Sequence, residues 1–176
     1  MNPITFTVYG HAEPAGSKQS FVPLHPKTKE PYRRPGGGIV VSTVDDNPKS
    51  KQWKKVIAKA AKESYRGSLL DGPLVVTFRF FRTRPKNHFA KYGLSKTGAQ
   101  SIAPDTRPDV LKLARAAEDA LIGVVYVDDS QIVEEHLFKH WGEPARLEVE
   151  IREAVEAEVL LFETAVDDRP PWERTA

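Results

Sequence analysis

The chain has 176 residues, a formal net charge of +2 and no cysteine. This length predicts one domain that buries its own core, and the lack of cysteine excludes disulfides, thiolate metal sites and cysteine nucleophiles. No stretch approaches the roughly 20 apolar residues of a membrane span and the N-terminus lacks a secretory pattern, so we expect a cytoplasmic protein without a membrane partner.

The small net charge hides a division along the chain. Residues 1–115 contain 21 Lys/Arg and 8 Asp/Glu, whereas residues 116–176 contain 5 and 16. A basic surface attracts nucleic acid, because phosphates that are neutralised by Lys and Arg release their counterions. The charge pattern alone is equally typical of solvated faces that pair with each other across a fold.

Hydrophobic periodicity and turn residues predict the secondary structure. In the first part of the chain we expect a strand over 4–9, a long Pro/Gly-rich loop over 10–38 and a short strand over 39–42. A helix follows, capped by Asn47 and ended by Gly67, with an apolar face of Trp53, Val56, Ile57 and Ala60. In the second part we expect a strand over 74–81, a basic connection over 82–106, a helix from Pro108-Asp109 to Gly123, and strands over 131–141 and 147–151. This order predicts an α/β (α+β) domain over residues 1–155, with helices covering a small mixed sheet. Residues 156–176 are expected to form an acidic, flexible tail.

The residues that suggest chemistry lie around the second predicted helix. Asp109 is at its start, and the pair Asp128-Asp129 follows a strand-like turn after its end. A chain reversal can fold this pair back towards Asp109, and clustered carboxylates can hold a metal ion that activates water for phosphodiester hydrolysis. Each acid also has a structural interpretation, because Asp109 can cap the helix and Asp128-Asp129-Ser130 is ordinary turn chemistry.

The wider pattern resembles the RusA family of Holliday-junction resolvases. The resemblance rests on Arg107-Pro108-Asp109, Asp119-Ala120-Leu121 and the run from Gly123 to Ile132 that contains Asp128-Asp129-Ser130-Gln131, with weaker support from the Gly-x-x-x-Pro-x-Gly-Ser-Lys stretch over 10–18. It implies a RusA-like fold and a small homodimeric, Mg²⁺-dependent endonuclease, with Mn²⁺ as a substitute. Such an enzyme, often encoded by a phage, nicks four-way DNA junctions in recombination and repair.

The resemblance also implies the site residues. Asp109, Asp128 and Asp129 match the metal-holding and catalytic acids of the family, and Arg115 matches its catalytic lysine. Leu111 stands where the family has a second Asp, and Lys112 where it has Asn. The missing carboxylate has two candidate replacements, Asp105 and Glu118, between which the sequence does not decide.

Basic residues outside the motif are candidates for contact with DNA phosphates, although each is also an ordinary solvated side chain. They are Lys18, Arg33, Arg34, Lys51, Lys54, Lys55, Arg82, Arg84, Lys86, Arg107 and Lys112. Two other hypotheses remain beside the nuclease: a non-catalytic junction-binding protein descended from one, and an unrelated α+β protein with capping aspartates.

Overall fold

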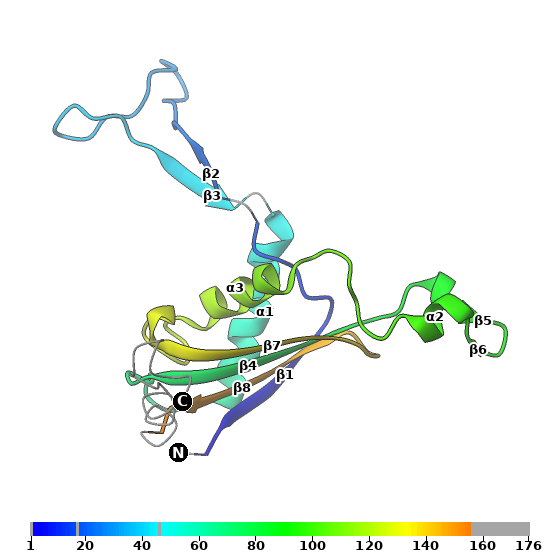
Figure 1. The fold of residues 1–176 in the computed structure, drawn as a ribbon. Helices are drawn as coiled ribbons and strands as arrows, with labels where there is room; N and C mark the ends of the chain where they lie inside the picture. Colours follow the sequence, from blue (N-terminus) through cyan, green and yellow to red (C-terminus); the bar gives the residue numbers. More distant parts are fainter. Residues whose placement is uncertain (1, 17, 46, 156–176) are drawn as a thin grey trace, which may run out of the picture.

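A four-stranded sheet with two long helices on one face forms the body of the protein (Figure 1). The computed structural model describes residues 2–16, 18–45 and 47–155. The strands lie in the order β1 (Ile4–Tyr9), β8 (Arg146–Glu153), β4 (Leu74–Arg82) and β7 (Ile132–Trp141). β4 pairs parallel with β7, whereas the other two pairings are antiparallel. The mixed sheet and the helices on it confirm the predicted α+β class.

Helix α1 (Pro48–Ser64) begins where the sequence predicts, because the Asn47 side chain accepts a hydrogen bond from the Lys49 amide at 3.1 Å. Its buried face consists of Ser50, Trp53, Ile57 and Ala61. The prediction that Val56 belongs to this face is wrong, since Val56 is 40% exposed. The helix also ends at Ser64, three residues before Gly67.

Helix α3 (Val110–Leu121) lies beside α1 and supplies a row of small and aliphatic side chains to the core. Leu113, Ala116, Ala117 and Leu121 are all completely buried. Gly123 follows the helix with a φ of +68°, a conformation that glycine adopts without strain, so the predicted end of this helix is confirmed. The next residues return to the body, where the buried Tyr126 hydroxyl donates to the Glu118 carbonyl oxygen at 3.0 Å.

Alternation along the strands explains why the core lies between the sheet and these two helices. β1 alternates buried and exposed residues throughout, and in β8 Leu147, Val149 and Ile151 are buried. Strand β4 lies inside the sheet between β8 and β7 and buries Leu74 to Phe78 as a continuous run. The predicted strands over 4–9, 74–81, 131–141 and 147–151 are therefore present, with ends that differ by one or two residues.

Residues 18–45 form a two-stranded arm that projects away from the body (Figure 1). The prediction of an unbroken loop over 10–38 is wrong, because β2 (Lys18–Phe21) pairs antiparallel with β3 (Ser42–Asp45). The strand expected over 39–42 begins only at Ser42, while Ile39 makes an isolated bridge with Arg33. Among the arm residues whose burial the structure describes, none belongs to the buried core.

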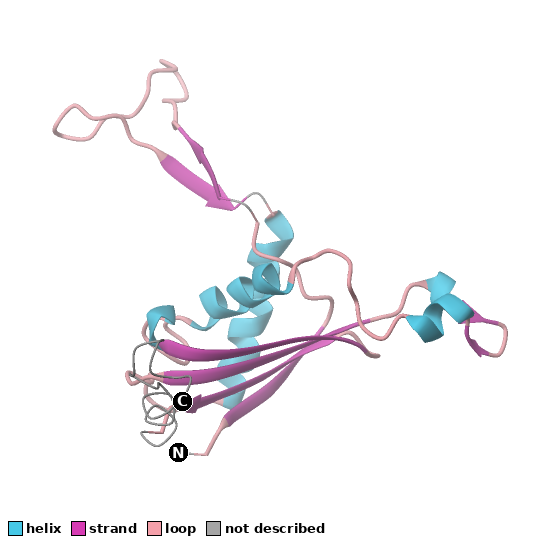
Figure 2. Cartoon of the chain, viewed as in Figure 1, coloured by secondary structure: helices cyan, strands magenta, loops and turns pink. Residues whose placement is uncertain are grey.

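A second projection, residues 84–104, leaves the end of β4 and returns to the start of α3 (Figures 1 and 2). We call it the protrusion. It contains a short helical turn η1 (Lys86–His88), the small hairpin of β5 (Phe89–Ala90) and β6 (Gly93–Leu94), and helix α2 (Lys96–Gln100). The sequence suggested only a basic connection here, because none of these elements is long enough to show periodicity.

The acidic tail predicted over 156–176 lies outside the described residues, so the domain boundary near residue 155 stays a prediction. In the described part of the chain no helix is long and apolar enough to cross a membrane.

Candidate active site

The loop before α3 is held in place by Lys139 of β7. The Lys139 ammonium donates to the carbonyl oxygens of Thr106 at 2.9 Å and Pro108 at 3.1 Å. Burial of the ammonium, followed by the nearby charge of Arg82, lowers the pKa of Lys139, whereas the carboxylates of Asp109 and Asp105 act in the opposite direction. Lys139 therefore fixes the backbone on both sides of Arg107 and is the common neighbour of Asp105 and Asp109.

Asp109 is the residue before the first turn of α3, but its carboxylate makes no capping hydrogen bond to the helix. Capping was the structural interpretation of this residue, and it predicts a bond from the carboxylate to a backbone amide of the first turn. Within the described ranges no other hydrogen bond holds the Asp109 carboxylate either. The geometry therefore leaves this exposed carboxylate available to a ligand.

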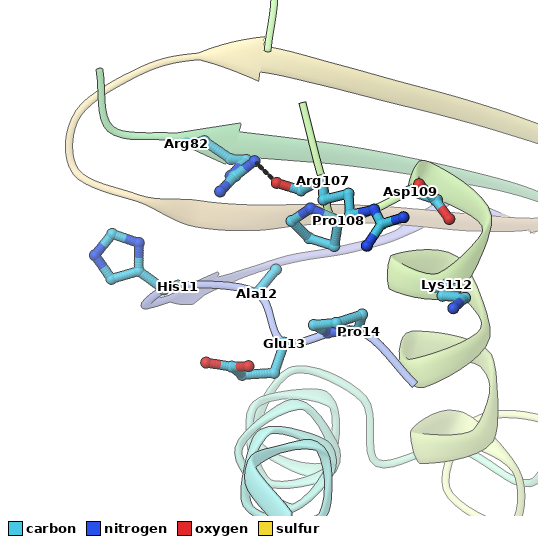
Figure 3. Close-up of a pocket in the computed structure, with 9 residues that line it drawn as sticks. All are labelled: His11, Ala12, Glu13, Pro14, Arg82, Arg107, Pro108, Asp109 and Lys112. Atoms are coloured by element: carbon cyan, nitrogen blue, oxygen red, sulfur yellow. Dashed lines mark hydrogen bonds between the residues drawn. The ribbon is translucent and has the colours of Figure 1, made fainter. Parts of the chain in front are cut away.

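Asp109 lines a pocket of about 530 Å³ with three cationic side chains (Figure 3). Arg82 comes from the end of β4 and donates to the Arg107 carbonyl oxygen at 2.9 Å, Arg107 precedes the helix, and Lys112 lies in its first turn. The remaining lining residues are His11, Ala12, Glu13, Pro14 and Pro108. The pocket suits a phosphate group, because three cationic side chains that line it can donate charge-assisted hydrogen bonds to phosphate oxygens.

His11 and Glu13 were not among the predicted site residues, although the structure places both in this pocket. They follow β1 at the opposite wall from α3 (Figure 3). They lie inside the Gly-x-x-x-Pro-x-Gly-Ser-Lys stretch that contributed to the resemblance, and this was the signal that could have identified them.

A second acidic group lies towards the other end of α3. Glu118, Asp129, Glu134 and Glu135 line a hollow of about 320 Å³ at the start of β7. Burial raises the pKa of Glu118 to about 8, helped by a hydrogen bond and charge from Glu135 and by the charge of Asp129. The Glu135 Oε1 atom is buried without a hydrogen-bond partner. At neutral pH one proton is therefore retained in this group.

Asp128 has a structural role at the same turn. Its carboxylate accepts from the Ser130 amide at 3.0 Å, and the Gln131 side chain accepts from the Asp128 amide at 2.9 Å, which makes a capping box for the short helix η2 (Asp129–Gln131). Hydrogen bonds from the Ser130 side chain and backbone lower the pKa of Asp128. The turn interpretation of Asp128 is thus supported, and Asp129 is the member of the pair that faces the hollow.

The structure separates the predicted acids into two groups. Asp109 and Glu118 are nine residues apart, which corresponds to about 13 Å along a helix axis. Arg115 is exposed and shares one helix face with Leu111 and Glu118.

Of the two candidate replacements for the missing carboxylate, Asp105 is near Asp109 and Glu118 is near Asp129. Over residues 2–16, 18–45 and 47–155 no three His, Asp or Glu side chains are placed to hold one metal ion.

The predicted DNA-contacting residues divide into engaged and exposed side chains. Lys54 forms a 2.6 Å ion pair with Asp119, and Arg84 donates to the carbonyl oxygens of Gly98 and Ser101, so these two hold the fold together. Arg33 donates to the Gly37 carbonyl oxygen within the arm, and Lys18 begins β2. The remaining candidates outside the pocket are all exposed: Arg34, Lys51, Lys55 and Lys86.

Carboxylates without hydrogen-bond partners and a cluster of cationic side chains are the groups that phosphodiester hydrolysis needs. The chain matches the family described as Endodeoxyribonuclease RusA over residues 22–152. It is also 31% identical to the uncharacterized protein YqaN of Bacillus subtilis (strain 168) over 156 residues, which cover 87% of this chain and 98% of YqaN. The chain therefore belongs to the RusA family of endodeoxyribonucleases, the hydrolases that resolve Holliday junctions.

Proposed function

We propose that this chain nicks four-way DNA junctions in a divalent-metal-dependent reaction, and that Asp109 is its central catalytic residue. The observation that supports the proposal best is the state of Asp109. Its carboxylate is exposed and free of capping bonds, and Asp109 lines one pocket with Arg82, Arg107 and Lys112. A carboxylate that only stabilised the helix would be bonded to its first turn.

The donor atoms on either side of α3 fit a hard cation. They are all carboxylate oxygens, the ligands that Mg²⁺ and Mn²⁺ prefer. Mg²⁺ is commonly held by one or two carboxylates, with water and substrate phosphate completing its shell. Because the acids form two groups along α3, we assign each group its own metal-holding residue: Asp109, with Asp105 as further support, and Asp129, with Asp128 and Glu118 as further support.

The remaining residues bind and orient the DNA strand. Arg82, Arg107 and Lys112 neutralise phosphate oxygens at the pocket, and Arg115 keeps its charge at every relevant pH because a guanidinium does not lose its proton. Glu118, in the other acidic group, holds a proton at neutral pH. When bound, the metal ion polarises the phosphate and lowers the pKa of the attacking water.

We further propose that the active form is a homodimer working on DNA in the cytoplasm of a bacterial or phage-infected cell. A four-way junction has two-fold symmetry, and two symmetrically related subunits would present two sites to it. Exposed Arg34, Lys51, Lys55 and Lys86 would contact phosphates outside the pocket. Sedimentation velocity of the free chain tests the dimer directly.

Cleavage of a synthetic four-way junction in Mg²⁺ or Mn²⁺ tests the proposed activity. Wild-type protein should nick the junction in preference to a linear duplex of the same arm sequence. Asp109→Asn should lower the nicking rate by at least about 100-fold while junction affinity is retained, because the carboxylate serves chemistry and not the grip on DNA. The matched control is Asp71→Asn, an exposed Asp outside both acidic groups. Equal nicking by Asp109→Asn and wild type would refute the assignment.

A second candidate function is a junction-binding protein without nuclease activity. It is favoured by Leu111, which replaces a carboxylate, and by the separation of the acids along α3. Tight junction binding with no nicking in either metal would establish this alternative.

A further inference from the structure

The tip of the protrusion presents an aromatic ring and a cation side by side. In its hairpin Phe89 pairs with Leu94 and Ala90 pairs with Gly93, so Lys91 and Tyr92 form the two-residue turn. Tyr92 is 88% exposed, and the Lys91 ammonium lies 5.1 Å from the centre of its ring. Gly93 has a φ of +117°, a value that allows this tight turn.

Tyr92 differs from its apolar neighbours Phe89 and Leu94 because its ring does not pack against the body of the protein. Phe89 and Leu94 line a hollow of about 320 Å³ with Arg84 and Trp141, so both lie where the hairpin meets the body of the protein. For Tyr92, the Lys91 ammonium is the one ring contact found among the described residues. The ring of Tyr92 is therefore accessible to a ligand at the end of the hairpin.

Contacts at the base of the protrusion fix it to the body of the protein and so position its tip. Arg84 donates to the carbonyl oxygens of Gly98 at 2.8 Å and Ser101 at 3.1 Å, and its guanidinium lies 5.3 Å from the Trp141 ring. The Trp141 indole donates to the Ser101 hydroxyl at 3.2 Å. Because Trp141 ends β7, these contacts fix the base of the protrusion to the edge of the central sheet.

Charge identifies the kind of ligand. Residues 83–104 contain Arg84, Lys86, Lys91 and Lys96 and no Asp or Glu. The protrusion also begins two residues after Arg82 and ends five residues before Asp109, both of which line the pocket proposed to receive the scissile phosphate. A polyanion bound in that pocket lies next to the base of an all-basic projection, whose tip carries an aromatic face suited to stacking on a base.

We propose that Tyr92 stacks on an unpaired or unstacked DNA base at the branch point, with Lys91 on the adjoining phosphate. Linear duplex offers no such base, since its bases are stacked on one another. This inference rests on the proposed function, because it takes branched DNA as the substrate. It assigns the protrusion a role in recognising the branch, separate from the chemistry at Asp109.

The experiment uses a four-way junction with 2-aminopurine at the branch point and a linear duplex with 2-aminopurine at the matching position, both in Ca²⁺ without Mg²⁺. Fluorescence of the probe reports unstacking, and titration gives the affinity. Tyr92→Ala and Tyr92→Leu should each weaken junction binding by roughly 5- to 150-fold and lose the fluorescence change seen with wild type, whereas Tyr92→Phe should keep both. Tyr9→Ala, which removes another exposed tyrosine, is the matched control and should behave as wild type.

Lys91→Gln separates charge from stacking. It should reduce the slope of log affinity against log salt by about 1 and leave the fluorescence change in place. Equal behaviour of Tyr92→Leu and Tyr92→Phe would show a general apolar contact, such as one with a protein, and would overturn the proposal, as would no effect of Tyr92→Ala. If the wild-type chain nicks junctions and prefers them to duplex, and the Tyr92 variants behave in the same way, only the role of Tyr92 is overturned. If the wild-type chain neither nicks junctions nor prefers them, the proposed function is overturned together with the role of Tyr92.

Discussion

Lys139 connects the sheet to the candidate site together with Arg82, since its ammonium donates to two carbonyl oxygens of the loop that ends at Asp109. Lys139→Met should lower the free energy of unfolding by about 1–3 kcal/mol, because two carbonyl oxygens lose a charged donor. It should also slow nicking by more than this loss of stability explains at a temperature where the fold is intact. Chemical denaturation and junction cleavage measure the two effects. A variant that is less stable but nicks at the wild-type rate would limit Lys139 to a structural role.

Glu118 gives the molecule a pH dependence of predictable sign. Its pKa is near 8 in the folded chain, against 4.5 for an ordinary Glu, so between these values the folded state binds a proton that the unfolded state releases. Its contribution to stability is complete below about pH 4.5 and is lost as pH rises through 8. Glu118→Gln should therefore remove a decline in Tm on the order of a few degrees between pH 5 and pH 8.5. Parallel Tm-against-pH curves for variant and wild type would contradict this.

Leu111 is a large apolar side chain that is 69% exposed on the face of α3 between the two acidic groups. Leu111→Asp should leave stability nearly unchanged and lower the Mg²⁺ concentration for half-maximal nicking several-fold, because it adds a carboxylate near Asp109 in the first turn of the helix. Leu111→Asn is the control for shape and polarity without charge. If the two variants need the same Mg²⁺ concentration, the missing carboxylate does not limit this site.

The protrusion is an element whose order depends on one close backbone contact. A Cβ atom on Gly98 would collide with the carbonyl oxygen of His88, and backbone cannot move aside as a flexible side chain can. Gly98→Ala should therefore loosen residues 84–104, which hydrogen exchange of that segment would show as lost protection, while the strands of the central sheet keep theirs. Gly36→Ala, at a glycine with open space around it, is the control. Unchanged protection in the protrusion would mean that the segment absorbs the added methyl group.

For the molecule as a whole, the arm and the body should be separable. No arm residue of described burial belongs to the core, and the arm's ends Lys18 and Asp45 are cross-strand partners that a short Gly/Ser linker can join. Replacing 18–45 by such a linker should change Tm by only a few degrees. It should also reduce the salt slope of junction binding by about 2–4, because five Lys/Arg residues are removed. An unchanged salt slope would exclude the arm from the DNA-binding surface.

The elements with long, regular residue patterns could be predicted from the sequence alone. The apolar run of β4, the alternation of β1 and β8, the cap of α1 and the end of α3 are local properties of the chain, so periodicity and capping residues identified them. The motif from Arg107 to Ile132 likewise indicated the RusA family, which the match over residues 22–152 confirms. These features follow from residues close to one another in sequence.

Which side chains are engaged depends on contacts between residues that are distant in the chain. Arg84 and Lys54 look the same in sequence as Lys86 and Lys51, but partners distant in the chain, Gly98 and Asp119, engage the first two. The short strands of the arm and the protrusion were missed because their pairing, and not their composition, stabilises them. The same reason applies to the acids: a straight helix keeps Asp109 about 13 Å from Glu118, and the return of β7 brings Glu135 to Glu118 and Lys139 to the loop before Asp109.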